Sequence, residues 1–547
     1  MRFSLCAALL FLSTPLFAAT PATHPNIVFL FADDLGWTDI ATGSTNFNNG
    51  NTYAQTPAID HLATEGMSFS NMHTCPNCAP ARASLMTGQY AVQNGVYNVG
   101  SLDRGTGSLE PATQRSQHIT REAVTFAETL KTAGYITCHV GKFHVSTHEE
   151  VTQFDGFDFD YGGGKKGDGT PHGYFAIHDP KSSTGWSFVA MAQEMDVFAT
   201  PYTKEYIDQN LKPYANNNDP SVLVGTPKHL TDADADAAID FMTKHLASPD
   251  KDKPFFINVA FNAIHAAVRS RRDLISKYNK IKSHDPRHPK ADFAALIEGE
   301  DQAIARILKF LDDNHLSDNT LVIFMSDNGG SAASTHNDPL RGYKGMFYEG
   351  GLRVPSIARL PGVIKPGTTT DQMVNMVDFY PTFCDFAGAK LPDPSVHRLD
   401  GLSFAPLLRG ETDESPRTVT YYHFPGYLDT RAFPCSTIIK KLDDHKNYKL
   451  IYSYEDQHYE LYNLTDDLSE KSDLLKDGKP TPDNQKIAIN LRDDLYHYLD
   501  TSHPLMAKSK TTHQPVPLPI PLDDALHSGN HISRSPFAPT GEAGGSD

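Results

Sequence analysis

Cysteine, basic charge and long apolar runs are all scarce in this chain of 547 residues. Six cysteines are too few for a small disulfide-stapled protein. Lys and Arg number 48 against 66 Asp and Glu, a net charge of −18, which argues against a general nucleic-acid binder because phosphate backbones need a basic surface. Past the N-terminus, no apolar run is long enough to span a bilayer, and no internal repeat is visible. The remaining composition, 39% hydrophobic, is that of a large globular domain with a smaller one.

The first residues predict export. Arg2 precedes an apolar stretch that extends, with one short break, from Leu5 to Phe17, and Ala18 and Ala19 follow. A positive start, an apolar stretch and small residues are typical of a secretory signal peptide, so we assign residues 1–19 to one and expect a periplasmic or secreted protein. Its removal would leave five cysteines, an odd number, so at least one would be unpaired within the chain or chemically altered.

Short apolar runs alternate with helical patterns through the first 400 residues. The apolar runs are 27–31, 135–140, 255–261 and 321–325, and the helical patterns are 123–133, 232–246 and 293–311. This alternation predicts an α/β fold in which helices cover both faces of a large, mostly parallel sheet. Each run ends in polar residues. Because ligands of such folds bind beyond the carboxyl ends of the strands, these residues predict one shared site.

The pattern changes after residue 400. Short runs at 419–423, 448–452 and 458–462 predict antiparallel strands, and 487–499 predicts a closing helix. We therefore expect a catalytic domain at 24–400, a smaller α+β subdomain at 401–500 and a Pro-rich tail at 501–547. A long aperiodic insertion occupies residues 149–230.

Acidic pairs at two of the strand ends predict a cation. Asp33 and Asp34 follow one apolar run, and Asp327 and Asn328 follow another. If these strands are neighbours, three carboxylates share one site and raise each other's pKa unless a charge compensates them. Oxygen ligands favour calcium or magnesium over zinc. The alternative for Asp33-Asp34 alone is a helix cap or a turn.

The segment CPNCAPARASLMTGQY, residues 75–90, carries the strongest signal. Cys75 and Cys78 have the spacing of a redox Cys-x-x-Cys. However, Cys78 also opens a predicted helix with Pro80 in its first turn, and Arg82 lies four residues later on the same face. A nucleophile beside an arginine at a helix N-terminus is suited to attack on an anion.

This segment resembles the signature of the formylglycine-dependent sulfatases of the alkaline phosphatase superfamily. Cys78, Pro80, Arg82 and Thr87-Gly88 match its core, Cys-x-Pro-x-Arg followed by Thr-Gly. Further segments match the family in the right order: GYITCHVGKFH (134–144), FFINVAFNAIH (255–265), SDNGG (326–330) and PLRGYKGMFYEGGLRVP (339–355). The resemblance covers roughly residues 24–500. Within this family, the chain resembles exported bacterial carbohydrate sulfatases in particular.

The resemblance implies a fold, a modified residue and a metal. The fold would be alkaline-phosphatase-like, with a mixed, mostly parallel sheet. A separate maturation enzyme would oxidise Cys78 to formylglycine, and a hydroxyl of the aldehyde hydrate would attack sulfur. One calcium would lower the pKa of that hydroxyl. The calcium ligands implied are Asp33, Asp34, residue 78, Asp327 and Asn328.

The resemblance also implies the roles of five other side chains. Arg82 would hold the hydrate, and Lys142 and Lys344 would grip the sulfate oxygens. His265 would protonate the leaving sugar oxygen. His144 would take the proton whose loss expels sulfate and restores the aldehyde.

The substrate implied is a sulfated oligosaccharide derived from a polysaccharide, with no nucleic acid and no membrane span involved. Candidate substrate contacts outside the catalytic motifs are Asp103, Arg104, His172 and His423. Two other functions stay open. One is a phosphodiesterase or phosphonate monoester hydrolase on the same scaffold. The other is a catalytically silent, calcium-dependent sugar-binding protein with Cys78 unmodified.

Overall fold

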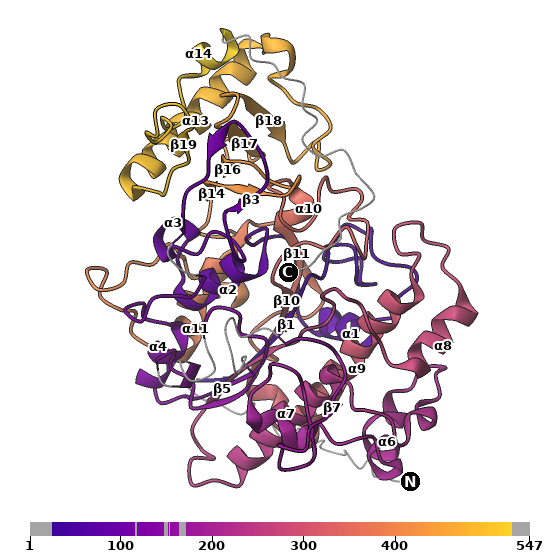
Figure 1. Ribbon diagram of the computed structural model, residues 1–547. Helices are drawn as coiled ribbons and strands as arrows, with labels where there is room; N and C mark the ends of the chain where they lie inside the picture. The colour runs from indigo at the N-terminus through magenta and orange to yellow at the C-terminus, as the bar shows by residue number, and fades with distance from the viewer. Residues whose placement is uncertain (1–23, 115–116, 147–150, 153, 163–170, 528–547) are drawn as a thin grey trace, which may run out of the picture.

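The computed structural model describes residues 24–114, 117–146, 151–152, 154–162 and 171–527 (Figure 1). The predicted signal peptide and the tail from residue 528 lie outside the described residues, as does part of the insertion. Within the described ranges, none of the helices combines the length and apolar character needed to cross a membrane.

A nine-stranded sheet forms the centre of the larger part of the molecule. Its strands are β1 (Asn26–Ala32), β2 (Met67–His73), β5 (Ile136–Gly141), β6 (Phe159–Gly162), β9 (Phe255–Ala260), β10 (Thr320–Ser326), β11 (Arg353–Arg359), β12 (Thr368–Thr370) and β13 (Val374–Asn375). The order is β12-β2-β11-β10-β1-β9-β5-β6, with β13 also paired to β2. All pairs are parallel except those that β11 makes with β10 and β2. The predicted mixed, mostly parallel sheet is confirmed.

Helices cover both faces of this sheet, as the continuous apolar strands predict (Figure 1). On one face lie α1 (Pro57–Glu65), α7 (Leu230–Leu246), α8 (Arg272–Ile281) and α9 (Ala291–Asp313). On the other face lie α2 (Cys78–Thr87), α4 (Phe126–Thr132) and α11 (Phe379–Ala387). Side chains along β1 alternate between the two cores: Val28 and Leu30 pack with the first group, and Ile27, Phe29 and Phe31 with the second.

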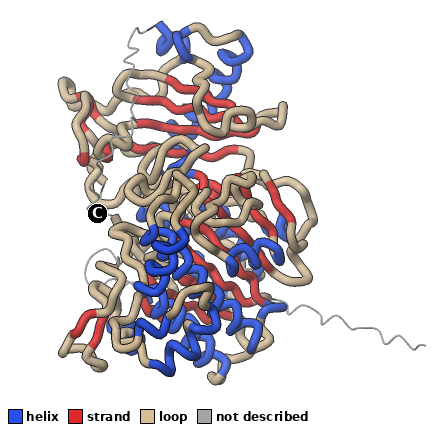
Figure 2. The backbone as a smooth tube through the Cα atoms, turned by 90° about the vertical axis from the view of Figure 1, so that its right-hand side faces the viewer, coloured by secondary structure: helices blue, strands red, loops and turns tan. Residues whose placement is uncertain are grey.

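A separate four-stranded antiparallel sheet lies beyond the large one (Figure 2). It consists of β14 (Val419–Phe424), β16 (Cys435–Lys441), β17 (Asn447–Ser453) and β18 (Tyr459–Asn463). The helix α13 (Pro482–Ser502) shares its core through Leu491 and Leu495. The described start of the tail folds onto this part: β19 (Lys508–Ser509) pairs with β4 (Leu109–Glu110), and α14 (Leu522–His527) packs against α13. Four of these elements, β4, β16, β19 and α14, have no counterpart among the strands and helices expected from the sequence.

The remaining elements are short. They are α3 (Ala91–Asn94), β3 (Asp103–Arg104), α10 (Glu349–Leu352), α12 (Ala405–Leu408) and β15 (Tyr427–Leu428), and in the insertion β7 (Ile177–His178), β8 (Trp186–Ser187) and α6 (Lys204–Asn210).

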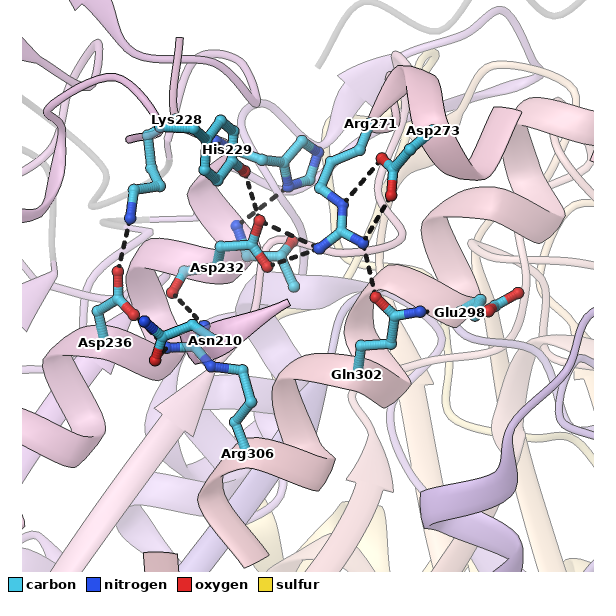
Figure 3. A network of polar contacts seen from close by, with 12 residues as sticks. Asn210, Lys228, His229, Asp232, Asp236, Arg271, Asp273, Glu298, Gln302 and Arg306 are labelled. Atoms are coloured by element: carbon cyan, nitrogen blue, oxygen red, sulfur yellow. Dashed lines mark hydrogen bonds and ion pairs between the residues drawn. The ribbon is translucent and has the colours of Figure 1, made fainter. Parts of the chain in front are cut away.

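A buried ionic network fastens the described part of the insertion to α7, α8 and α9 (Figure 3). Arg271 Nη1 donates to Asp232 Oδ1 at 3.0 Å. Lys228 Nζ, at the end of the insertion, donates to Asp236 Oδ2 at 2.9 Å, and Arg306 of α9 binds the other oxygen of Asp236. All three cations are almost completely buried. The insertion is therefore held against the helices of one face rather than extending into solvent.

The carboxyl ends of the central parallel strands meet at one edge. Ala32 pairs with Ser326, and Ala260 pairs with both Phe31 and Gly141. The polar segments that follow β1, β5, β9 and β10 are thereby brought to the same edge, as the sequence predicts.

Candidate active site

The helix α2 delivers Cys78 to this edge. Its first residue is Cys78, whose backbone N–H donates to the side chain of Asn77 at 3.1 Å, and Gly88 ends the helix with a left-handed φ of 64°. Cys78 is completely buried. Its Sγ lies 3.4 Å from Asp33 Oδ1 and 3.6 Å from Asp34 Oδ1. Cys78, the predicted nucleophile position, and the acidic strand end therefore share one site.

Three carboxylates converge around Cys78. Its Sγ and carboxylate oxygens of Asp33, Asp34 and Asp327 all lie within 4.8 Å of one another. The amide of Asn328 joins them: Nδ2 donates to Asp34 Oδ1 at 2.8 Å, while the buried Oδ1 has no hydrogen-bond partner among the described residues. A set of carboxylate oxygens with an unpartnered amide oxygen fits a hard divalent cation such as calcium.

Every one of these carboxylates also contacts a buried cation. The pairs are Lys142 with Asp33 at 2.6 Å, Lys344 with Asp34 at 3.0 Å, and Arg82 with Asp327 at 2.8 Å. Burial alone would raise the pKa of Asp33, but the surrounding positive charges, Lys142 foremost, together outweigh burial and hold that pKa well below its usual range. Burial and the charge of Asp33 raise the pKa of Asp327 to about 7. A cation bound among the three acids would oppose that rise.

Several contacts hold the Arg82 side chain in place. Its Nε and Nη2 both donate to Asp327 Oδ2, at 3.0 and 2.8 Å, and Nη1 donates to the backbone O of Lys142 at 2.8 Å. Its guanidinium also lies over the ring of Phe31, 4.9 Å from the centroid. Arg82 is thus locked beside Cys78.

The two predicted catalytic histidines have different surroundings. His144 is buried and has a left-handed φ of 72°, a strained backbone conformation of a kind found at functional sites. Burial, reinforced by the charge of Lys142, lowers its pKa well below the ordinary value, so its imidazole is neutral near pH 7. His265 is slightly exposed, and its Nε2 lies 3.8 Å from Asp34 Oδ2.

Sequence reasoning missed Tyr174, which lies in the insertion. Its hydroxyl is 2.7 Å from the backbone O of Asn262 and 2.7 Å from that of His265. The insertion therefore supports the loop that carries His265. The insertion has no periodic pattern, so the sequence contains no signal for this contact.

The candidate substrate contacts are dispersed. Asp103 is exposed on β3, and Arg104 lies 3.6 Å from the carboxylate of Asp429. His172 is exposed in the insertion, where its backbone N–H donates to Val189 O at 3.1 Å. None of these contacts involves the acidic cluster.

The prediction for His423 needs correction. This residue is buried in β14, its Nδ1 lies 2.7 Å from Ser436 Oγ, and its Nε2 lies 2.7 Å from Leu505 O. Because both ring nitrogens have partners inside the C-terminal part, His423 links β14 to β16 and to the segment after α13 and presents no free nitrogen to a ligand.

The redox interpretation of Cys75 and Cys78 is not supported by their geometry. All five described cysteines are buried and unbonded to one another. Cys75 contacts Ser84 Oγ at 3.5 Å, and burial raises its pKa to about 11. Burial also raises the pKa of the Cys78 thiol well above its usual value, which disfavours thiolate chemistry at either residue.

Known proteins are similar to this chain in sequence and in fold. Residues 25–389 match the family model described as Sulfatase, and residues 342–500 match the one described as N-sulphoglucosamine sulphohydrolase, C-terminal. The chain is 42% identical over 497 residues to a sulfatase of Formosa agariphila, covering 87% of this chain and 88% of that protein. It is 30% identical over 419 residues to mouse (Mus musculus) N-acetylgalactosamine-6-sulfatase, covering 74% of this chain and 70% of that one.

A solved structure is also similar to this chain over nearly its whole length. The crystal structure of Ps i-CgsB in complex with k-i-k-neocarrahexaose aligns with a TM-score of 0.63 at 25% identity, over 93% of this chain and 98% of that chain. The family model covers well over half of the sequence and spans every residue of the acidic cluster together with Arg82, Lys142, His144, His265 and Lys344. The chain belongs to the sulfatase family.

Proposed function

We propose that the protein hydrolyses sulfate esters on sulfated oligosaccharides, with a formylglycine made from Cys78 and one bound calcium ion. The observation that carries the proposal is the position of Cys78, whose Sγ lies among Asp33, Asp34 and Asp327 at the start of α2. Family membership supports the reaction class.

The chain's own residues would build the site around residue 78. Asp33, Asp34, Asp327 and Asn328 would hold the cation from one side. When in place, the formylglycine hydrate supplies the attacking hydroxyl and the calcium lowers its pKa. Arg82, fixed by Asp327 and by the Lys142 carbonyl, would orient residue 78.

Two lysines would bind the sulfate group, and two histidines would transfer protons during its hydrolysis. Lys142 and Lys344 would bind its oxygens, which gain negative charge in the transition state. His265, on its loop after β9, would donate a proton to the leaving sugar oxygen. His144, held neutral by burial and by Lys142, would accept a proton from residue 78 when sulfate is released.

Maturation and export complete the proposal. Cys78 is completely buried in the folded chain, so the maturation enzyme would have to act before this segment folds. The predicted signal peptide supports an exported enzyme.

Two relatives support a sugar substrate. Ps i-CgsB was solved with k-i-k-neocarrahexaose, and the mouse relative is an N-acetylgalactosamine-6-sulfatase. We therefore propose a sulfated sugar, and the particular sugar is a matter for a screen of defined sulfated oligosaccharides.

Two measurements test the function against its alternatives. One preparation is assayed on an aryl sulfate and on an aryl phosphodiester: faster sulfate turnover supports the proposal, and faster phosphodiester turnover favours the phosphodiesterase. The mass of the tryptic peptide carrying residue 78 shows whether the thiol has become an aldehyde. An unmodified Cys78 in an inactive preparation from a host with the maturation enzyme would favour the silent sugar-binding protein.

A further inference from the structure

Strand pairing brings together two segments beside the Lys344 loop that are more than 300 residues apart in the sequence. β3 follows the nucleophile helix, and β15 belongs to the C-terminal part. They pair in parallel, with Tyr427 opposite Asp103 and Leu428 opposite Arg104. The backbone N–H of Asp429 also donates to Arg104 O. This ribbon has no role in the site described above.

Two arginines on the ribbon share one carboxylate oxygen. Arg431 Nη2 donates to Asp429 Oδ2 at 2.7 Å, and Arg104 Nη2 lies 3.6 Å from the same atom. The side chains of Arg104, Arg431 and Asp429 are 24%, 22% and 49% exposed. Side chains alternate along a strand, which directs Asp103 to the opposite side from Arg104. Two cations against one anion leave a local positive charge on a chain whose net charge is −18.

Most donors of the two guanidinium groups have no hydrogen-bond partner among the described residues. Among the described residues, Asp429 is the only ion-pair partner of either arginine side chain. Arg431 Nε is buried without a hydrogen-bond partner there. Each guanidinium has five N–H donors in a planar fork that matches a carboxylate or a sulfate. A single shared aspartate satisfies few of them: it accepts a hydrogen bond from Arg431 and lies within ion-pair distance of Arg104.

Arg431 lies directly against the Lys344 loop. A Cβ placed on Gly345 would be 3.4 Å from Arg431 Cδ and 3.6 Å from its Nε, so the arginine stem packs on the residue that follows Lys344. The N–H of Gly345 donates to Pro76 O at 2.6 Å, two residues before Cys78. The arginine pair is therefore adjacent to the predicted sulfate-binding residues without contacting the acidic cluster.

We infer that Arg104 and Arg431 form a subsite for an anionic group, a carboxylate or a second sulfate, on the sugar residue next to the one that loses its sulfate. This inference rests on the proposed function. The subsite would select acidic oligosaccharides over equally sulfated ones with a neutral neighbour. Arg431 and Arg104 would bind the anion, and Asp429 would act as the positioning residue between them.

The test uses three disaccharides that carry the same sulfated hexosamine. Its neighbour is a hexuronate in the first, a sulfated hexose in the second and a neutral hexose in the third. Their inhibition constants against 4-nitrophenyl sulfate hydrolysis, and their dissociation constants by calorimetry, are measured for the wild-type protein, Arg104→Ala, Arg431→Ala and Arg431→Lys. Arg272→Ala, an exposed arginine on α8, is the matched control.

We expect the wild type to bind at least one anionic disaccharide about 5- to 10-fold more tightly than the neutral one, the scale of a partly exposed charge-assisted contact. Arg104→Ala and Arg431→Ala should abolish that preference, Arg431→Lys should keep part of it, and Arg272→Ala should keep all of it. The preferred disaccharide identifies the anion as carboxylate or sulfate.

Failure of the subsite and failure of the function are separable. Equal binding of all three disaccharides, or a preference that survives both alanine variants, overturns the subsite even if the enzyme desulfates sugars. A preference that depends on the arginines, in a protein that hydrolyses no sulfate ester, supports the subsite and refutes the proposed function.

Discussion

The Lys142 ammonium lies 2.6 Å from the Asp33 carboxylate, and both side chains are completely inaccessible to solvent. The same side chains are predicted to serve different ligands, Asp33 a cation and Lys142 a sulfate. Lys344 and Asp34 repeat the arrangement at 3.0 Å. Each lysine is paired with a carboxylate that is a predicted metal ligand. A cation that binds these carboxylates would therefore compete with the lysines for them and should make the lysines more available to sulfate. Cation and sulfate binding should therefore reinforce each other.

Removing the metal should abolish sulfatase activity. After treatment with a chelator, calcium should restore activity better than zinc, because all the protein ligands predicted besides residue 78 are oxygen atoms. Calcium should also raise the melting temperature, since a ligand at 100 times its dissociation constant adds about 2.7 kcal/mol to the free energy of unfolding. Activity and thermal melting are measured on the same samples.

Asp327→Asn is the matched variant for this experiment. It should weaken both the recovery of activity by calcium and the rise in melting temperature, because one predicted anionic ligand becomes neutral. A protein that elemental analysis shows to be metal-free and that is fully active would contradict the assignment of Asp33, Asp34, Asp327 and Asn328.

Cys78→Ser should abolish sulfate ester hydrolysis, with a loss of about 10³-fold or more, as for removal of other nucleophiles. Serine has nearly the same shape but cannot form an aldehyde hydrate. The circular dichroism spectrum and melting temperature should stay close to those of the wild type. Near-native turnover by a folded Cys78→Ser protein would refute the formylglycine mechanism.

Cys75→Ala should leave the modification intact. Cys75 is buried against Ser84 and lies outside the Cys-x-Pro-x-Arg core, so its spacing from Cys78 is incidental. Mass spectrometry of the peptide carrying residue 78 measures the aldehyde directly. A folded Cys75→Ala protein without formylglycine would assign Cys75 a part in maturation.

Much of this site could be anticipated from the sequence because it is built from strand ends. Asp33-Asp34 and Asp327-Asn328 follow uninterrupted apolar strands whose register is now seen to align Ala32 with Ser326. Strands that are buried on both faces, and the polar residues that follow them, can be recognised in short stretches of sequence. The α/β pattern then predicts that these strand ends lie side by side. Helix α2 is similarly local: Pro80 and Gly88 mark its two ends.

The contacts that the sequence did not reveal are all long-range. His423 lies in a predicted strand, but its partners Ser436 and Leu505 depend on the packing of β16 and of the segment after α13. Tyr174 belongs to an aperiodic insertion, and Arg431 lies next to the residue after Lys344 although 86 positions separate Gly345 from it in the sequence. No local propensity encodes which distant backbone a side chain meets.

Lys449→Met should destabilise the protein strongly. Lys449 is completely buried in β17 and pairs with Glu349 at 2.8 Å and Glu470 at 2.7 Å, which ties α10, just after the Lys344 loop, to the C-terminal sheet. Without the ammonium, two buried carboxylates lose a shared partner, at a cost of about 3–5 kcal/mol. The free energy of unfolding is measured by urea denaturation.

An exposed lysine on the same sheet provides the control. Lys446 pairs with Asp466 at 2.5 Å but is 38% exposed, so Lys446→Met should change the free energy of unfolding by about 1 kcal/mol or less. Adding Glu470→Gln to Lys449→Met should recover part of the loss, because Glu349 keeps its ion pair with Arg353 whereas Glu470 loses the one cation it contacts among the described residues. Equal, small effects of the two lysine variants would show that the buried network contributes little.

His265→Ala should harm sugar sulfate turnover far more than nitrophenyl sulfate turnover. A sugar alkoxide is a poor leaving group that needs a proton, whereas nitrophenolate is stable without one, and general acid catalysis is typically worth about 10²–10⁴-fold.

His144→Ala should slow hydrolysis of both substrates, because the step assigned to His144 follows departure of either leaving group. Tyr174→Phe should resemble His265→Ala in kind but be weaker, about 5-fold, since it removes the hydroxyl that contacts the backbone O of Asn262 and of His265 and so supports the His265 loop. Plotting kcat/KM against leaving-group pKa separates these outcomes: a steeper slope for His265→Ala and a slightly steeper one for Tyr174→Phe assign the acid to that loop. Equal losses on both substrates for His265→Ala, with an unchanged slope, would place the acid on another residue.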